Sequence, residues 1–513
     1  MDKNFYITTP IYYPSAQPHM GHAYSSIIAD FFARFKRIDG FNVHFLTGTD
    51  EHGLKIQRSA ERAGLDPQEF CDKISQTFRD LSEILNLSNT DFIRTTEERH
   101  KKTVQNLWKE LEKNDDIYLS NYSGWYSVSD EAFYNDDEIE EVNGKKIALS
   151  SKSTVEWIEE ESYFFRLSKW EKQLLSYYQS NPDFISPESR KNEVISFVKS
   201  GLKDLSVSRK TFSWGIPVPN NNNHVIYVWL DALTNYLSAL NYPNKEDELF
   251  KKFWPASIHL IGKDILRFHA VYWPAFLLAA KIDLPKKVYG HGWILSGEEK
   301  MSKSKGNILD PLKIIKDYGL DPLRYYLIKE VSFGNDGNIS QERLEDCINS
   351  DLANNYGNLC QRVTAFASKN CDGKIPSKIK FLQEDLKILN KYKDNLNVIR
   401  EKIDEQNINF YIDYIINSLF EANKYFNDQE PWKKKDDLIR LNTIVYTALE
   451  IVRKISFLLY PIIPESSLKA LKIFNLFEKD IDIESIKDNE FLVKDKKINS
   501  IDILFKKIEK KND

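Results

Sequence analysis

Cysteine is scarce in this sequence, and no two cysteines lie close together. Four occur among 513 residues: Cys71, Cys347, Cys360 and Cys371. Without a C-x-x-C pair, the sequence indicates neither a disulfide framework nor a tetrahedral zinc site. We therefore interpret all four as isolated, reduced thiols.

Long apolar runs are also absent. No window approaches the ~18 consecutive apolar residues that a membrane span requires, so we expect no membrane partner. The first residues, Met1 to Asn4, lead directly into a strand-like run that begins at Phe5, which leaves no room for a secretion signal. We expect a soluble, cytoplasmic protein.

A strong charge of one sign is missing as well. The formal net charge is -5, with 42% hydrophobic and 29% charged residues. This globular composition excludes a basic nucleic-acid coat, so any contact with RNA must come from local patches such as Lys433–Lys435. The length exceeds that of one ordinary core, and we expect about two to four domains.

The N-terminal region alternates strand and helix signals. The run Phe5–Tyr13 is β-branched and aromatic, and apolar residues between Ile27 and Ile38 recur at helical spacing. Gly40 closes that helix, and Asn42–Thr47 reads as a second buried strand. This order predicts a parallel sheet and hence an α/β, Rossmann-like fold.

The same signals return after an acidic, aromatic stretch. Strands are expected at Val225–Trp229, Ile258–Ile261 and Val288–Trp293, with an apolar helix between Ile265 and Ala280. After Pro311, amphipathic patterns predict a helical bundle. We therefore divide the chain into the first half of an α/β domain (1–114), an inserted connective subdomain (115–211), the second half (212–310), a linking helical segment (311–345) and an α-helical domain (346–513).

Two histidines bracket a glycine in the phrase Pro18–His22, where the first strand gives way to the first helix. Ligands of an open parallel sheet bind beyond the carboxyl ends of its strands, and a helix N-terminus presents N–H groups to phosphate. Gly21 would let the backbone approach a nucleotide, and His19 and His22 can each donate a hydrogen bond to a phosphate oxygen. The alternative is that these histidines merely cap the helix or pack.

A cationic loop follows the last predicted strand. The phrase Lys300–Asn307 holds three lysines, two serines and a glycine. Such a loop suits a triphosphate whose charge grows as pyrophosphate departs, and no Walker glycine frame surrounds it. The alternative is a solvated basic turn, but the presence of both phrases in this order favours a nucleotide site.

These phrases make the sequence resemble the class I aminoacyl-tRNA synthetases, whose HIGH and KMSKS motifs match His19–His22 and Lys300–Ser304. Other stretches resemble the methionyl-tRNA synthetase family in particular: Thr8–Tyr13, Gly48–Gly53, Trp214–Pro219, Val228–Leu233, Gly262–His269 and Gly290–Trp293. The resemblance implies ATP-dependent activation of L-methionine to methionyl-adenylate with release of pyrophosphate. Transfer of methionine to the 3′ end of tRNA(Met) would follow.

The resemblance also implies residue roles. The expected catalytic groups are His19, His22, Lys300 and Lys303, and Mg²⁺ is expected to accompany ATP. ATP is expected to contact His19, Gly21, His22, Gly262, Asp264 and Lys303. The methionine ammonium would pair with Asp50, and the other pocket positions that match the family are Ile11, Tyr13, Trp229, Ala232, Leu233, Tyr236 and His291. Without the resemblance, Trp229 and Tyr236 would be interpreted as ordinary core.

Segment 346–513 resembles the anticodon-binding domain of that family. The expected anticodon contacts are Asn358, Arg362, Pro431 and Trp432, because an indole can stack on an unpaired base while Asn and Arg can read its edge. By sequence alone, a helical Asn or Arg is an ordinary surface residue. No additional dimerising domain is evident, so we expect a monomer.

The insert departs from the family pattern. Many members carry cysteine knuckles there, whereas Gly124–Asp130 has serines and an aspartate in their place. Ser and Asp cannot replace thiolates in a structural site, so we expect no structural zinc. Packing of Trp125, Tyr126 and Phe133 is expected to hold this part instead.

Four rival functions remain. Synthetases for leucine, isoleucine or valine share both motifs but carry a much larger editing insert, and a cysteinyl enzyme depends on zinc thiolates. A nucleotidyltransferase without tRNA would leave the helical C-terminal part without a task. A catalytically dead, tRNA-binding relative would not need intact His19, His22 and Lys303.

Overall fold

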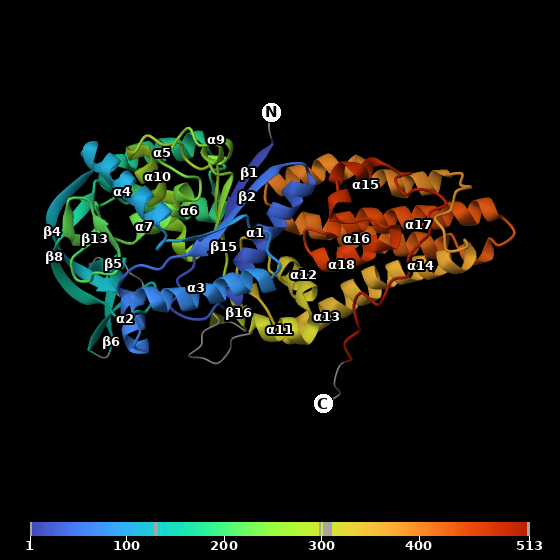
Figure 1. The fold of residues 1–513 in the computed structure, drawn as a ribbon, viewed down its shortest axis with the longest axis horizontal. Helices are drawn as coiled ribbons and strands as arrows, with labels where there is room; N and C mark the ends of the chain where they lie inside the picture. Colours follow the sequence, from blue (N-terminus) through green and yellow to red (C-terminus); the bar gives the residue numbers. More distant parts are fainter. Residues whose placement is uncertain are drawn as a thin grey trace. The chain divides into compact units, whose positions relative to one another are not determined.

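The computed structural model describes residues 3–127, 132–134, 136–142, 144–296, 299–300 and 310–509. The chain forms two compact units. The sheet unit comprises residues 4–18 and 43–291, and the helical unit comprises residues 1–3, 19–42 and 292–513. Their helices and strands are labelled in Figure 1.

The sheet unit is built on six strands in the order β3-β2-β1-β14-β15-β9. These are β1 (Asn4–Thr8), β2 (Asn42–Thr49), β3 (Asp91–Arg94), β14 (Ile258–Gly262), β15 (Val288–His291) and β9 (Ile185–Ser186). The pairs β2–β3, β1–β14, β14–β15 and β15–β9 are parallel, and Tyr12 forms a parallel bridge with Thr49 beyond the end of β1. The predicted parallel α/β fold is confirmed.

The strands are apolar because they are buried. Leu46, Ile93, Ile261 and Val288 are fully buried in one core. Helices α4 (Glu98–Lys113), α7 (Trp229–Leu233), α8 (Asn235–Ser238), α9 (Glu248–Phe253) and α10 (Trp273–Ala279) of the same unit contribute to this core. Helices α2 (Leu54–Ala63) and α3 (Pro67–Ile84) pack buried residues into two smaller clusters. Gly48 allows β2 to approach β3 closely, because a Cβ there would lie 2.0 Å from the carbonyl oxygen of Ile93.

Several predicted boundaries were wrong. The strand expected at Val225–Trp229 is instead β13 (Asn221–Ile226), which pairs antiparallel with β11 (Ser208–Arg209) and β12 (Ile216–Val218) outside the parallel sheet. β-branched composition indicates a buried strand but does not say which sheet it joins. The first strand ends at Thr8, ahead of Pro10, which has no N–H to donate.

The region predicted as an insert forms its own antiparallel sheet, in the order β10-β8-β4-β5. Its elements are β4 (Ile117–Ser127), β5 (Ala132–Tyr134), β8 (Glu156–Phe165) and β10 (Leu205–Ser206), with the hairpin β6 (Ile139–Val142) and β7 (Lys145–Ala148) and helices α5 (Glu171–Ser180) and α6 (Glu188–Lys199). The two-residue strand β9 lies within the same region, yet it pairs with β15 of the parallel sheet. The insert therefore supplies the sixth strand of that sheet.

The helical unit contains α1 (Met20–Ile38) and the C-terminal helices. These are α11 (Pro311–Tyr318), α12 (Leu320–Glu330), α13 (Gln341–Cys347), α14 (Asn358–Asn370), α15 (Gln383–Asp404), α16 (Ile408–Asp428), α17 (Leu438–Leu459) and α18 (Pro464–Leu471), with the short strands β16 (Ile294–Ser296), β17 (Glu299–Lys300) and β18 (Gly337–Asn338). Helices α14 to α17 pack alongside one another (Figure 1), so the predicted helical bundle is confirmed. None of the described helices is long and apolar enough to cross a membrane.

A buried carboxylate fixes α1 within this unit. Asp30 accepts hydrogen bonds from Arg34 at 2.8 Å and from Arg324 of α12 at 2.6 Å, and Arg324 also donates to the carbonyl of Ile462 at 2.9 Å. Asp30 and Arg324 are both fully buried, where an unpaired charge would be costly. These hydrogen bonds join the middle of α1 to α12 and to the segment before α18.

Candidate active site

The ends of β1 and β2 bring three predicted site residues together. The Tyr12 N–H donates to the carbonyl of Gly48 at 2.8 Å, and the Asp50 N–H donates back to the carbonyl of Tyr12 at 2.9 Å. Asp50 is 4% exposed, whereas Ile11 and Tyr13, on either side of Tyr12, are half-buried. A carboxylate therefore lies at the carboxyl edge of the sheet, where α/β proteins bind ligands.

The next two strands, β14 and β15, end at the same edge. Gly262 is the register partner of His291. A Cβ at position 262 would lie 2.6 Å from the Asp264 carboxylate oxygen and 4.0 Å from Cε1 of His291, so a side chain larger than hydrogen would displace Asp264. The structure therefore brings the three predicted residues together. One of them, Asp264, has an exposed carboxylate that can accept hydrogen bonds from hydroxyl groups.

Helix α7 contributes the predicted apolar wall. Ala232 and Leu233 are buried, and the ring of Trp229 stacks on that of Phe268 with a centroid distance of 3.6 Å and an interplanar angle of 14°. Phe268 begins the π-helical turn η4 (Phe268–Tyr272). This stack fixes the orientation of the indole, although sequence reasoning did not identify Phe268.

Tyr236 is held by a buried hydrogen-bond chain. The His269 ring bonds through Nδ1 to the carbonyl of Ile265 at 3.0 Å, so that nitrogen carries the proton and Nε2 accepts from the Tyr236 hydroxyl at 2.7 Å. Burial lowers the pKa of His269 to about 4, which keeps the ring neutral. Tyr236 also stacks on His259 at 4.1 Å and belongs to the main core, so the structure satisfies the core interpretation of this residue as well.

The residue after Asp50 is anchored by charge. Glu51 is fully buried and accepts from Arg94 at 2.7 and 3.0 Å, from Thr49 at 2.7 Å and from Thr96 at 2.5 Å. Both of its carboxylate oxygens are therefore occupied. Glu51 is thus a structural anchor for the turn that carries Asp50.

The second residue after Asp50 is also anchored. His52 Nδ1 lies 2.7 Å from Oδ2 of Asp231, and His100 Nε2 lies 2.7 Å from Oδ1 of the same carboxylate. Burial raises the pKa of Asp231, but the two histidines outweigh burial and lower it to about 2. The carboxylate is accordingly ionised, and it joins the turn after β2 to α7 and α4.

In the helical unit, His19 and His22 form a reciprocal cap at the start of α1. The Gly21 N–H donates to Nδ1 of His19, and the His19 N–H donates to Nδ1 of His22, both at 3.1 Å. The rings stack at 3.8 Å. Because each Nδ1 accepts, a neutral ring carries its proton on Nε2, which is a donor suited to phosphate. Capping and phosphate binding, set out above as alternatives, use different nitrogens and are compatible.

The lysine-rich loop falls largely outside the described residues. Lys300 pairs with Leu295 in the short ladder of β17 and β16, but its side chain and the whole of Lys303 lie outside the described part of the chain. Phe133, expected to pack in the insert, likewise has its side chain outside it. Of its expected neighbours, Trp125 packs edge-on against Trp157 at 5.1 Å, and Tyr126 is buried and bonded to Tyr227.

The anticodon candidates lie near one another within the helical unit. Arg362 donates to Asn427 at 2.6 Å and lies over the ring of Phe426 at 5.7 Å, and Trp432 meets the same ring edge-on at 6.3 Å. Asn358 precedes Arg362 by four residues on α14, which places both on one face of that helix. Pro431 is buried, whereas Trp432 is 41% exposed, so an indole face is available for stacking.

No group of three or more His, Cys, Asp or Glu side chains in the described ranges could hold a metal ion. All four cysteines lie in those ranges, and none forms a disulfide there. Burial raises the pKa of each thiol, and that of Cys371 is about 11. A raised pKa disfavours the thiolate that metals and electrophiles require.

Comparisons with known protein families identify the family of the chain. A family model described as tRNA synthetases class I (M) matches residues 5–364, and one described as the anticodon binding domain of methionyl tRNA ligase matches residues 375–513. The chain belongs to the class I methionyl-tRNA synthetase family. This synthetase is a ligase that activates methionine and charges tRNA.

Individual relatives cover nearly the whole synthetase. The methionine–tRNA ligase of Brucella suis is 50% identical over 473 residues, and that of Rickettsia felis is 52% identical over 478 residues, each alignment covering 92% of both chains. A Mycobacterium tuberculosis methionyl-tRNA synthetase solved in complex with methionyl-adenylate is 44% identical with a TM-score of 0.95, covering 98% of this chain and 99% of that one.

Sequence reasoning missed the residues that hold the predicted pocket residues in place. They are Glu51, His52, Arg94, His100, Asp231 and His269. One signal was available, since Asp231 is a charged residue inside the apolar run Val228–Leu233. A carboxylate in such a run needs a buried partner, but sequence spacing does not say which histidine supplies it.

Proposed function

We propose that methionine activation takes place at the carboxyl edge of the parallel sheet. The observation that carries this proposal is a buried carboxylate, Asp50, at the end of β2, together with an aromatic and apolar wall carried by α7 and α8. Asp50 would pair with the substrate ammonium. Ile11, Tyr13, Trp229, Ala232, Leu233, Tyr236 and His291 would enclose the side chain, whose polarisable thioether suits aromatic surfaces.

ATP would be bound by two sets of groups. Gly262 and Asp264 would receive the ribose, because the glycine leaves space and the carboxylate accepts from hydroxyls. The Nε2 protons of His19 and His22, the backbone at Gly21 and the ammonium of Lys303 would bind phosphate oxygens, with Lys300 also contributing charge. Mg²⁺ would accompany ATP and would supply charge neutralisation for the departing pyrophosphate.

The chemistry needs no covalent enzyme intermediate. A carboxylate oxygen of methionine attacks the α-phosphorus of ATP, the bond to the bridging oxygen breaks, and pyrophosphate leaves. A ribose hydroxyl of the terminal tRNA adenosine then attacks the activated carbonyl and AMP departs. The protein contributes position and charge stabilisation. The complex of the Mycobacterium tuberculosis relative with methionyl-adenylate supports the first step.

The tRNA partner would be tRNA(Met), recognised by Asn358, Arg362, Pro431 and Trp432 through stacking and base-edge contacts. The exposed indole and the basic Arg362 beside it support this assignment. The five-segment division of the chain, with the anticodon-binding domain at 346–513, stays a proposal. So do the monomeric state and the cytoplasmic location.

Amino-acid-dependent exchange between ATP and pyrophosphate tests the proposal. Exchange should occur with methionine and be much weaker with the nineteen other amino acids, including leucine, isoleucine, valine and cysteine. Asp50→Asn should raise the KM for methionine by about tenfold or more, since a charge-assisted contact is lost. Comparable exchange with another amino acid, or an unchanged KM in Asp50→Asn, would overturn it. Charging of tRNA(Met) then tests the transfer step.

A further inference from the structure

Asp231 lies at the centre of a network that no role above requires. It is 1% exposed and sits on α7, two residues after Trp229 and directly before Ala232. Each carboxylate oxygen has an imidazole partner at 2.7 Å, His52 on one side and His100 on the other. Asp231 points into the protein and is a partner of other side chains, not a lining residue.

The first partner of Asp231, His52, lies close in sequence to Asp50, which is proposed to bind the methionine ammonium. His52 follows Asp50 by two residues, and Glu51 between them is fixed by Arg94 and Thr96. The turn is therefore held from two sides, by Arg94 behind it and by Asp231 on α7. Any shift of α7 relative to this turn would have to break a buried, charge-assisted hydrogen bond.

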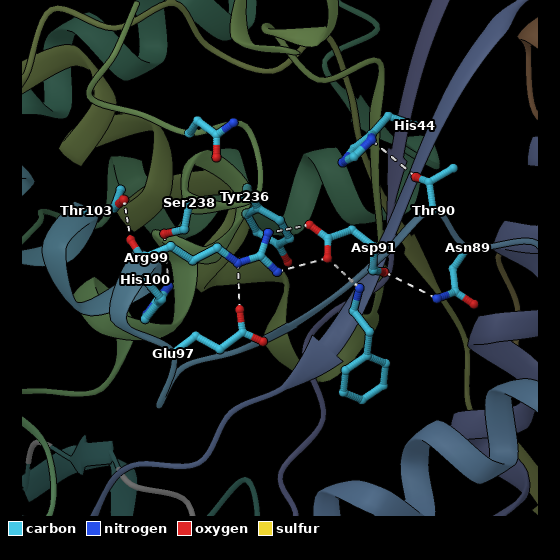
Figure 2. Close-up of polar contacts among 12 residues, drawn as sticks. His44, Asn89, Thr90, Asp91, Glu97, Arg99, His100, Thr103, Tyr236 and Ser238 are labelled. Atoms are coloured by element: carbon cyan, nitrogen blue, oxygen red, sulfur yellow. Dashed lines mark hydrogen bonds and ion pairs between the residues drawn. The ribbon is translucent and has the colours of Figure 1, made fainter. Parts of the chain in front are cut away.

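The second partner of Asp231, His100, is bonded to α8, which carries Tyr236 of the proposed pocket wall. His100 Nδ1 lies 3.0 Å from the hydroxyl of Ser238, which also bonds to the carbonyl of Thr234 and lies on α8 two residues after Tyr236. Figure 2 shows His100 facing Ser238, with Tyr236 nearby. His100 thus joins α7 and α8, the two short helices that carry Trp229 and Tyr236.

The position of His100 is itself fixed. The neighbouring Arg99 forms paired bonds to Asp91 of β3 at 2.8 and 2.9 Å and a further bond to Glu97 at 2.6 Å (Figure 2). These ion pairs tie the first turn of α4 to the sheet. Asp231 therefore receives its two hydrogen bonds from groups that are both anchored to the sheet.

We propose that Asp231 is a positioning residue for methionine, which sets the distance between the Asp50 carboxylate and the pocket wall formed by α7 and α8. This inference rests on the proposed roles of Asp50, Trp229 and Tyr236. A substrate held at both ends depends on that distance, because a misplacement of even 1 Å weakens both contacts together. Asp231 touches neither ATP nor tRNA in this scheme, so its effect is confined to the amino acid.

The test is Asp231→Asn, which keeps the size of the side chain but replaces one acceptor with a donor. In pyrophosphate exchange, the KM for methionine should rise about tenfold, while the KM for ATP stays within about twofold of wild type. The preference for methionine over ethionine, which is one methylene longer, should fall by about fivefold, because the distance between the Asp50 carboxylate and the pocket wall is no longer fixed. Loss of folded protein alone would lower the active fraction and leave both KM values and this preference unchanged.

Asp116→Asn is a matched control. Asp116 is also 1% exposed and accepts two hydrogen bonds, from Lys169 at 2.7 Å and Trp170 at 3.2 Å, but neither partner is among the predicted site residues. Its methionine KM and its preference over ethionine should match wild type. Equal changes in both variants, or an unchanged methionine KM in Asp231→Asn, would overturn the inference.

Two further variants separate the possible failures. If Asp231→Asn is not recovered folded, His52→Phe, which keeps a ring but has no N–H to donate to Asp231, is measured in the same way, and a wild-type KM for methionine in that variant overturns the inference. If Asp50→Asn raises this KM while Asp231→Asn does not, only the positioning role fails. If Asp50→Asn has no effect, the proposed function of Asp50 fails, and the positioning role fails with it.

Discussion

The two units present the side chains that are predicted to bind ligands in opposite ways. In the sheet unit, Asp50 and Tyr236 are 4% and 1% exposed, and Tyr236 has a bonded partner behind it. In the helical unit, Trp432 is 41% exposed and packs edge-on against the ring of Phe426. A pocket for a small substrate is organised before binding, whereas a surface for a large RNA leaves its aromatic face to be covered by the ligand.

The difference reflects what each ligand can contribute. Methionine has few groups, so binding energy depends on fixed geometry around each of them. A tRNA brings many phosphates and bases, and one stacked base contributes about 1–3 kcal/mol without rigid support. Buried networks such as Glu51–Arg94 and Asp231 with its histidines are therefore expected behind the amino-acid pocket, and the anticodon surface needs fewer of them.

The largest effect is expected for a variant of His22. This residue belongs to the helical unit but is proposed to act in catalysis, so a large effect would show that catalytic groups are not confined to the sheet unit. His22→Glu retains an acceptor for the His19 N–H, as in a capping box, but has no N–H to donate to a phosphate oxygen. We expect kcat for pyrophosphate exchange to fall about 100-fold, since a lost charge-stabilising donor costs roughly 2–4 kcal/mol. The melting temperature should change little. A large loss of stability with normal kcat would show that the histidine only caps the helix.

A second prediction concerns pH and the sheet unit. Burial raises the pKa of Asp231, yet His52 and His100 lower it overall to about 2, whereas an unfolded Asp titrates near ~3.9. Because the pKa of Asp231 is lower in the folded state, the ionised carboxylate raises the free energy of unfolding by about 2 kcal/mol above pH ~4. This contribution is lost as the pH falls towards 2. The melting temperatures of the wild type and of Asp231→Asn should differ most near neutral pH, and the difference between them should become smaller in acid. A gap independent of pH would contradict the ionised pair.

Trp432→Ala tests the exposed side of the comparison. We expect kcat/KM for charging tRNA(Met) to fall about tenfold through loss of one stacked base. Pyrophosphate exchange, measured without tRNA, should be unchanged. Phe420→Ala is a suitable control, because Phe420 is more exposed, at 66%, and is not among the anticodon candidates. Equal losses in both variants would indicate a general surface effect.

The smallest effect is expected for Tyr236→Phe. The variant keeps the ring but leaves Nε2 of the buried His269 without its donor at 2.7 Å. We expect a loss of about 1 kcal/mol in stability and a few-fold rise in the KM for methionine. If both the unfolding midpoint and the KM for methionine are unchanged, the hydrogen bond between Tyr236 and His269 contributes neither to stability nor to methionine binding.

The sequence predicted the parallel sheet because strand–helix–strand periodicity is a local signal. Asn42–Thr47 and Ile258–Ile261 were placed within two residues of the observed ends. It could not place Val225–Trp229, because pairing partners are chosen by tertiary contacts and not by composition. Nor could it predict β9, a strand of two residues with no periodicity to read.

The candidate site divides in the same way. Residues predicted to line the pocket stand in the phrases that resemble the family, and Asp50 and Tyr236 were predicted through those phrases. Residues that support them were missed, because His52 and Asp231 are 179 positions apart in the chain, and His100 and Ser238 are 138 apart. Only the folded chain brings such groups within hydrogen-bond distance.

The two-residue strand β9 has a consequence for how this protein can be cut or rebuilt. Since β9 lies within the insert yet pairs with β15, excising the whole insert would leave the backbone of β15 unpaired along one side. An open strand of this kind is a template for intermolecular association. A shortened enzyme that keeps Ile185 and Ser186 in place should stay in solution, whereas one that omits them should aggregate.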